Sequence, residues 1–186
     1  MNKIDVLLKN YIKTIEIPWR NTAAAQRVIF AVYNKTDELR IRARLGEFEI
    51  ATKNAENGKH GWAHFDITNT FAEWMHSLKY AQSYYQKPHL LGSIIKRYGD
   101  FIEKKFDELL NKENLSSADI IAVTGVGSVF GLIKVSELVD KLSPRFSGRL
   151  LVFFPGSYSE MHNYQLLDGY DGWNYHAIPI TCDREI

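Results

Sequence analysis

Residues 120–156 constrain the fold most, because they have the pattern of a strand, a glycine turn, a helix, a loop and a second strand. That order is typical of a βαβ unit, in which a helix joins two parallel strands. The turn after the first strand, where many folds of this kind bind phosphate, contains Thr124, Gly125, Gly127 and Ser128. We therefore take these four residues as a candidate phosphate or ligand turn.

The glycine turn departs from the known phosphate-binding fingerprints. No Lys-Ser or Lys-Thr pair follows the glycines, which excludes a Walker loop. The third glycine of a dinucleotide fingerprint would have to be Gly131, which comes one residue late. A Gly-x-Gly turn also serves simply to reverse the chain between a strand and a helix. The sequence favours this structural role, and nucleotide or phosphate binding is the alternative.

Strand-like runs and helical periodicity alternate along the rest of the chain. The run RVIFAVY at residues 27–33 is apolar on both faces, which is typical of a parallel strand covered on both sides. Further strands are predicted at residues 62–67 and 175–180, and helices at residues 3–16, 36–54, 70–78, 94–110 and 131–142. This alternation predicts an α/β fold: one Rossmann-like three-layer domain over residues 1–186, with a mostly parallel sheet and helices on both faces.

Several local signals refine these elements. Thr70 has the spacing of a capping box with Glu73, and Ser93 is expected to cap the long helix after it. Residues 39–45, LRIRARL, alternate as an edge strand would, but oppositely charged side chains four residues apart favour a helix there. Residues 157–174 contain two Asp-Gly turns and are expected to form a turn-rich aromatic segment.

Composition excludes several classes of function. The chain has 23 basic and 22 acidic residues and a net charge of +1, so its total charge gives no attraction for nucleic acid. Its one cysteine, Cys182, cannot form an internal disulfide or a multi-cysteine zinc site, which is consistent with a reducing compartment. No apolar run approaches the roughly 20 residues of a membrane span, and residues 1–19 do not resemble a signal peptide. We expect a cytoplasmic protein that does not contact the membrane.

No group of residues has the spacing of a catalytic or metal site. Ser128 lacks the Gly-x-Ser-x-Gly context of a nucleophile elbow, and the six histidines form no recognised ligand pattern. Asp37 and Asp66 could hold a cation or act as bases, but a helix cap and a turn explain them more simply. Cys182 has no neighbour that would lower its pKa. The sequence thus predicts a non-catalytic protein without metal or cofactor.

Two surfaces are candidates for contact with other molecules. Ligands of open α/β sheets collect beyond the carboxyl ends of the strands, here residues 34–37, 66–69, 124–128 and 155–158. The aromatic residues from Tyr158 onward form a candidate partner interface, because Tyr and Trp are favoured in interface cores; they are Tyr158, Tyr164, Tyr170 and Trp173. The alternative is that this segment folds over the protein's own core.

A basic cluster on the second predicted helix is a third candidate surface. It consists of Arg40, Arg42 and Arg44, but on a helix Arg42 would point nearly opposite to the other two, and nearby glutamates dilute the charge. Such a cluster is typical of a solvated face. Contact with DNA through Arg40 and Arg44 is the alternative.

Several segments occur together and in order along residues 15–181. They are IPWR at 17–20, RVIFAVY at 27–33, LRIRARLGEFEIATK at 39–53, FAEWM at 71–75, TGVGSVF at 124–130, RLLVFFPGSY at 149–158 and GWNYHAIPI at 172–180. In combination they resemble the BrxB family of the bacteriophage exclusion (BREX) defence systems. Where many family members have Phe-Pro-Gly-Glu-Tyr, this chain has Ser157 in place of the glutamate. Residues 131–142 resemble one family subtype, whereas the other carries a Pro and a His there.

The resemblance implies a small cytoplasmic component of an antiviral operon. Its neighbours there would be a methyltransferase (PglX), an ATPase (BrxC) and the alkaline-phosphatase-like protein PglZ. The family has no assigned catalytic residues, so the resemblance implies none. PglZ is the expected partner, together with other BREX proteins and an indirect association with DNA through the complex.

Overall fold

A computed structural model describes residues 2–19, 21–159, 163–167, 169 and 173–183. Its centre is a sheet in the order β2-β3-β4-β1-β7, and every neighbouring pair in that order is parallel. The strands are β1 (Val28–Tyr33), β2 (Trp62–Asp66), β3 (Ile120–Thr124), β4 (Arg149–Ser159) and β7 (Ile178–Thr181). All six residues of β1 are buried, as expected for a central strand covered on both faces.

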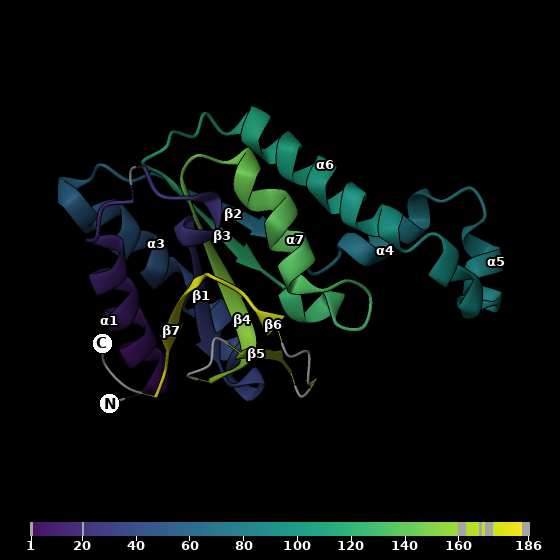
Figure 1. The fold of residues 1–186 in the computed structure, drawn as a ribbon, viewed down its shortest axis with the longest axis horizontal. Coiled ribbons are helices and arrows are strands. Elements are labelled where there is room, and N and C mark those ends of the chain that lie inside the picture. Colours follow the sequence, from purple (N-terminus) through teal and green to yellow (C-terminus); the bar gives the residue numbers. More distant parts are fainter. Residues whose placement is uncertain (1, 20, 160–162, 168, 170–172, 184–186) are drawn as a thin grey trace.

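Helices cover both faces of this sheet (Figure 1). One face carries α1 (Lys3–Ile15), α2 (Glu38–Ala43) and α3 (Leu45–Asn54), which pack on strand residues such as Ile29 and Ala31. The other face carries α4 (Thr70–Ser77), α6 (Lys96–Lys112) and α7 (Val135–Leu142), which pack on residues such as Val28 and Phe30. Because successive side chains of a strand point to opposite faces, β1 contributes to both cores. The predicted Rossmann-like α/β fold with three layers is confirmed.

The helix predicted over residues 36–54 is present, but it is divided. It begins as the 3₁₀ turn η2 (Lys35–Asp37), continues as α2, and breaks at Arg44, which has φ −106° and ψ 9°, before α3 starts. The edge strand that LRIRARL could have formed is therefore absent from this segment, and the helical alternative is the correct one.

Two predicted helix caps are wrong. Thr70 is the first residue of α4, and its hydroxyl donates to the carbonyl of Ile67 at 2.7 Å instead of capping the helix. Ser93 belongs to the 3₁₀ helix η4 (Pro88–Ser93), and its hydroxyl donates to the carbonyl of Leu90 at 2.8 Å; α6 begins only at Lys96. In both cases the hydroxyl bonds backward to a carbonyl three residues earlier, which is a competing use of Ser and Thr side chains.

The segment between β4 and β7 contains strands that the sequence analysis did not predict. β4 continues past the parallel sheet and pairs antiparallel with β5 (Asn163–Leu166), which in turn pairs with β6 (Trp173–Asn174). The last strand begins at Ile178, three residues after its predicted start. The helix predicted at residues 131–142 starts later too, because the 3₁₀ turn η5 (Val126–Val129) and a loop precede α7.

The remaining elements are short. The 3₁₀ helices are η1 (Ala24–Arg27), η3 (Ala55–Asn57) and η6 (Ser143–Arg145). Helix α5 (Ala81–Gln86) lies at one end of the long axis of the molecule, far from α1 and α3 (Figure 1). None of the helices in the described ranges is long and apolar enough to cross a bilayer.

Candidate functional site

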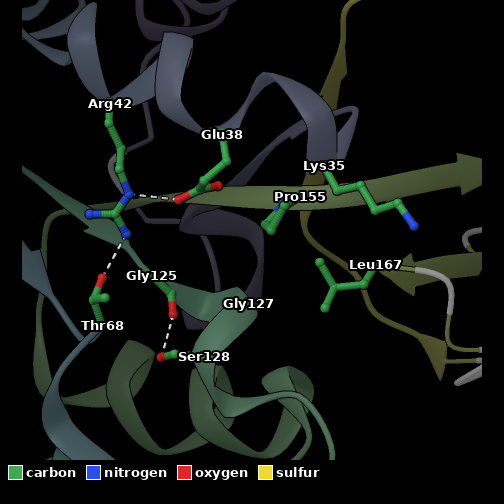
Figure 2. A pocket seen from close by; sticks show the side chains of 9 residues that line it. All are labelled: Lys35, Glu38, Arg42, Thr68, Gly125, Gly127, Ser128, Pro155 and Leu167. Atoms are coloured by element: carbon green, nitrogen blue, oxygen red, sulfur yellow. Dashed lines mark hydrogen bonds and ion pairs between the residues drawn. The ribbon is translucent and has the colours of Figure 1, made fainter.

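The loops at the carboxyl ends of the strands converge on one cavity of about 330 Å³ (Figure 2). It lies between α2, which covers one face of the sheet, and η5, which leads to the other face. A change of face between neighbouring connections is where open α/β sheets place ligands. The cavity, which we call the crevice, is lined by Lys35, Glu38, Arg42, Thr68, Gly125, Gly127, Ser128, Pro155 and Leu167.

Gly125 is required by the close approach of the loop that follows β2. Its φ of +81° lies in the left-handed region, which side chains disfavour. A Cβ atom here would lie 2.6 Å from the amide nitrogen of Thr68, closer still to the Thr68 hydroxyl, and 2.9 Å from a carboxylate oxygen of Asp66. Gly127 differs, because a Cβ there would meet only Pro155 at 3.5 Å and Leu167 at 3.8 Å. The first glycine therefore serves packing, and the second leaves space beside the crevice.

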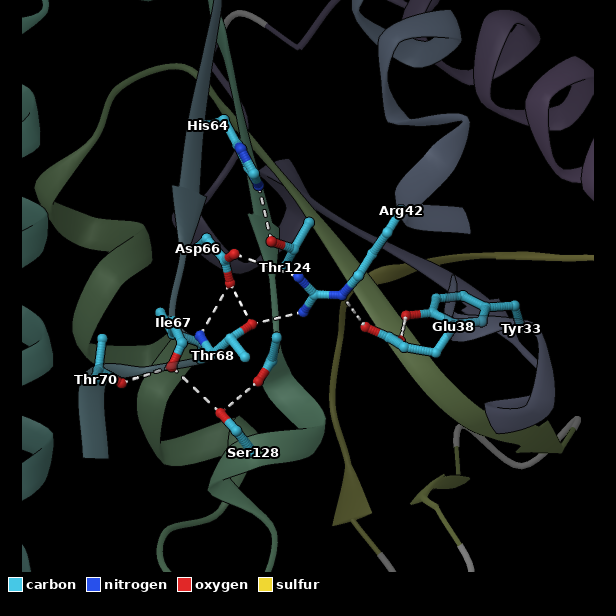
Figure 3. Close-up of polar contacts among 11 residues, drawn as sticks. Tyr33, Glu38, Arg42, His64, Asp66, Ile67, Thr68, Thr70, Thr124 and Ser128 are labelled. Carbon is cyan, nitrogen blue, oxygen red and sulfur yellow. Dashed lines mark hydrogen bonds and ion pairs between the residues drawn. The ribbon is translucent and has the colours of Figure 1, made fainter. Parts of the chain in front are cut away.

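The two hydroxyl groups of the candidate turn bond to the protein itself. Thr124 is buried, and its hydroxyl lies 2.8 Å from Nε2 of His64 on the neighbouring strand (Figure 3). The Ser128 hydroxyl lies 2.7 Å from the carbonyl oxygen of Gly125 and 3.3 Å from that of Ile67. The turn leads into a 3₁₀ helix of only four residues, so it does not provide the dipole of a long helix for an anion in the crevice.

Arg42 is the centre of the polar contacts in the crevice (Figure 3). Its Nε donates to Glu38 at 2.7 Å, one terminal nitrogen donates to Asp66 at 3.3 Å, and the other donates to the Thr68 hydroxyl at 2.6 Å. Asp66 also accepts from the Thr68 amide at 2.9 Å, and Glu38 accepts from the Tyr33 hydroxyl. This network connects the end of β1, the helix α2 and the loop after β2.

Electrostatics keep Arg42, Asp66 and Tyr33 in their usual ionisation states at neutral pH. Burial alone would raise the pKa of Asp66, but the hydrogen bonds from Thr68 and the charge of Arg42 outweigh it and lower that pKa. Burial would likewise lower the pKa of Arg42, but Glu38 and Asp66 outweigh it and raise that pKa. The pKa of Tyr33 is raised far above its ordinary value, first by burial and then by its bond to Glu38. The pair Arg42 and Asp66 is therefore charged, and Tyr33 is neutral.

The aromatic residues of the candidate partner interface separate into different environments. Tyr158 is partly exposed, and its ring lies 4.8 Å from that of Tyr164. Tyr164 is fully buried against Phe30, and its hydroxyl donates to the carbonyl of Ala177 at 3.2 Å. The prediction that Tyr164 contributes to an exposed partner interface is therefore wrong, and the alternative, that it packs on the protein's own core, is the correct one for this residue. Its burial follows from its place in β5, which faces the core. Tyr170 and the side chain of Trp173 lie outside the described residues.

The arginines of the basic cluster are all paired with carboxylates. Arg40 lies 3.2 Å from Asp37, and Arg44 lies 2.7 Å from Asp5 and 2.6 Å from Glu47. Arg42 points away from Arg40 and Arg44, as the helical spacing predicted, and its side chain lines the crevice. The sequence analysis did not assign Arg42 or Glu38 to the crevice, although the opposite direction of Arg42 on the helix indicated a separate role for it.

Further candidates for chemistry in the sequence have structural explanations. Cys182 lies 3.5 Å from the carbonyl oxygen of Val32, and burial raises the pKa of its thiol to about 11, which keeps it protonated. Within the described part of the chain, no group of three or more His, Cys, Asp or Glu side chains is placed to hold a metal ion.

Comparison with known proteins adds an independent observation. The family model for the BREX protein BrxB matches residues 67–180, a range that contains the glycine turn, the strand pair β4 and β5, and most of β7. No curated protein and no solved structure gives a match.

Proposed function

Because this chain belongs to the BrxB family of BREX phage-defence proteins, we propose that it acts as a non-catalytic adaptor that binds the phosphatase-like protein PglZ. The observation that supports a non-catalytic role is that the polar side chains of the crevice form hydrogen bonds with one another and with the backbone. The groups that converge where an α/β enzyme would hold its reacting groups bond to one another instead.

The crevice contains the side chains that acid–base or nucleophilic catalysis would use, but these are engaged. Arg42 donates to Glu38, Asp66 and Thr68, and the Ser128 hydroxyl lies against backbone carbonyls rather than against a base. A nucleophile of this kind needs a neighbouring base that can take its proton. The network instead favours a rigid framework that holds the strand ends together.

We place the partner surface on the end of β4 and its neighbour β5. The backbone there is held by the antiparallel pairing of Ser157 with Gln165 and of Tyr158 with Tyr164. Buried Tyr164 supports the ring of Tyr158, so this partly exposed ring is oriented before any partner binds. A stable interface should bury at least about 1,000 Å² in total and depend on a few such anchors.

Copurification and calorimetric titration with PglZ test the adaptor proposal. We expect a stable complex that Tyr158→Ala weakens, with Tyr170→Ala and Trp173→Ala as further changes in the same segment. Ile50→Ala is the matched control, because Ile50 is 61% exposed on α3 and lies away from β5. Absence of a complex at micromolar concentrations, with both proteins folded, would reject the proposal. An equal loss with Ile50→Ala would reject the placement of the interface.

A second candidate function is regulation by a nucleotide or another phosphate compound bound in the crevice. The supporting observation is the cavity itself, which combines about 330 Å³ of space with two cationic lining residues, Arg42 and Lys35. Gly127→Asp would place a carboxylate in the space beside this turn without a severe clash, and it should abolish binding. Gly46→Asp is the control, because a Cβ at exposed Gly46 meets nothing within 4 Å. Nucleotide titrations that leave the melting temperature of the wild type unchanged would reject this function.

A further inference from the structure

The strongest concentration of unpaired positive charge lies away from the crevice, in a segment that contains α5. Residues 74–99 contain Lys79, Lys87, Lys96 and Arg97 but no Asp or Glu. We call residues 78–97 the basic arm. The whole chain has a net charge of +1, so the four charges of the arm leave the rest of the chain at −3. A molecule with this distribution orients its arm toward a polyanion.

The cations of the basic arm are exposed and available. Lys79, Lys87, Lys96 and Arg97 are all exposed, and none forms a salt bridge with any residue that the structure describes. They differ in this from Arg40, Arg42 and Arg44, in α2 and at the break after it, which carboxylates neutralise. A cation without a partner can bind a phosphate without first breaking an ion pair.

Two aromatic rings are exposed among these cations. Tyr80 is 60% exposed and Tyr85 is 63% exposed, and Nζ of Lys79 lies 5.5 Å from the centre of the Tyr80 ring. Other apolar residues of the arm pack against the core instead and hold the arm in place; they are Leu78, Tyr84, Leu91, Ile94 and Ile95. The arm therefore presents four cations and two tyrosine rings to solvent, among mostly neutral polar residues and without a carboxylate.

We propose that the basic arm binds single-stranded nucleic acid. Proteins that bind single strands combine cations along the phosphate backbone with aromatic rings on which unpaired bases stack. In a duplex the bases stack on one another and leave no free faces for Tyr80 and Tyr85, so the rings favour a single strand. A protein partner fits less well, because Leu90 is the one large aliphatic side chain in the arm that is substantially exposed, which is little for an apolar interface core. This proposal does not depend on binding of PglZ.

Fluorescence anisotropy with a labelled 20-nucleotide oligo(dT) and a 20-base-pair duplex tests the proposal. The wild type should bind oligo(dT) more tightly, and four cationic contacts predict a slope of about −3 for the logarithm of affinity against the logarithm of salt concentration. Lys79→Glu with Lys87→Glu should remove at least two contacts and weaken binding about 25-fold at 0.1 M salt. Tyr80→Ala with Tyr85→Ala should weaken it about 30-fold or more, and the corresponding Phe variants should not.

A charge-matched control separates the arm from total charge. Lys59→Glu with Lys134→Glu changes the net charge equally at exposed positions outside the arm, and it should change affinity less than the arm variant does. Circular dichroism confirms that each variant is folded. The proposal is rejected if the wild type does not bind oligo(dT) at tens of micromolar protein and low salt, or if both charge variants lose affinity equally. It is also rejected if the arm variants lose PglZ while oligo(dT) is unaffected, since the arm would then be a protein-binding surface.

Discussion

Replacement of Gly125 by alanine tests whether a glycine is required here because Thr68 and Asp66 approach it closely. The new Cβ would lie 2.6 Å from the Thr68 amide nitrogen and 2.9 Å from an oxygen of Asp66, so the loop after β2 must move. Such a movement breaks or lengthens the bonds by which Thr68 holds Asp66, at 2.9 Å from the amide and 2.5 Å from the hydroxyl. The change therefore adds a backbone cost at φ +81° to the loss of hydrogen bonds.

The size of the effect follows from these two contributions. A side chain in the left-handed region costs about 1–2 kcal/mol. One hydrogen bond lost to a charged group costs about 1.5–3 kcal/mol. We therefore expect Gly125→Ala to lower the free energy of unfolding by about 2.5–5 kcal/mol, which for a chain of this size corresponds to a drop of about 5–20 °C in melting temperature.

Gly131→Ala supplies the matched control. Gly131 has a φ of +74°, but a Cβ there meets nothing within 4 Å, so alanine should cost only the backbone contribution of about 1–2 kcal/mol. Urea denaturation followed by circular dichroism gives both values. If the two variants lose equal stability, the close approach of Thr68 and Asp66 does not explain Gly125, and the reasoning is wrong.

Two further predictions concern residues whose roles the structure defines. Trp19→Ala should lower the free energy of unfolding by about 3–5 kcal/mol, because the side chain is only 4% exposed. Its indole donates to the carbonyl of Ser117 at 3.0 Å, and the buried guanidinium of Arg149 lies 4.5 Å from the centre of its ring. A loss below about 1 kcal/mol in urea denaturation would contradict this packing role. The pKa of Asp66 is lowered on folding, so its contribution to stability is present above the ordinary value of 3.8 and is lost as the pH falls through the lowered value. Asp66→Asn should therefore flatten the loss of stability during acid titration followed by circular dichroism.

The central strands could be predicted because burial on both faces leaves a clear pattern. The run at residues 27–33 is apolar throughout, and its observed strand is completely buried. The order of the strands could not be predicted, since pairing of β1 with β4 depends on contacts over more than a hundred residues. The short strand β5 was also missed, because four residues among turn signals carry too little alternation to be distinguished from a loop.

The position of the crevice could be predicted, but the residue that organises it could not. Parallel strands bring their carboxyl ends to one edge, which explains why Thr68, Gly125 and Pro155 meet there. Arg42 comes from a helix, and the sequence pairs it with Glu38 as a surface ion pair four residues away. Its additional contacts with Asp66 and Thr68 arise only when α2 packs over the strand ends.

The pairing of β1 also determines when this protein can fold during synthesis. Val28 pairs with Leu150 and Ile29 with Ile178, so both neighbours of this wholly apolar strand are translated long after it. At about 5–20 residues per second, the roughly 120 residues between β1 and β4 take on the order of 6–24 s to emerge. During that interval β1 has no strand to join and remains a target for chaperones or for aggregation. The yield of folded protein should therefore depend on translation speed and chaperone supply more strongly than for a protein of similar length whose neighbouring strands are close in sequence.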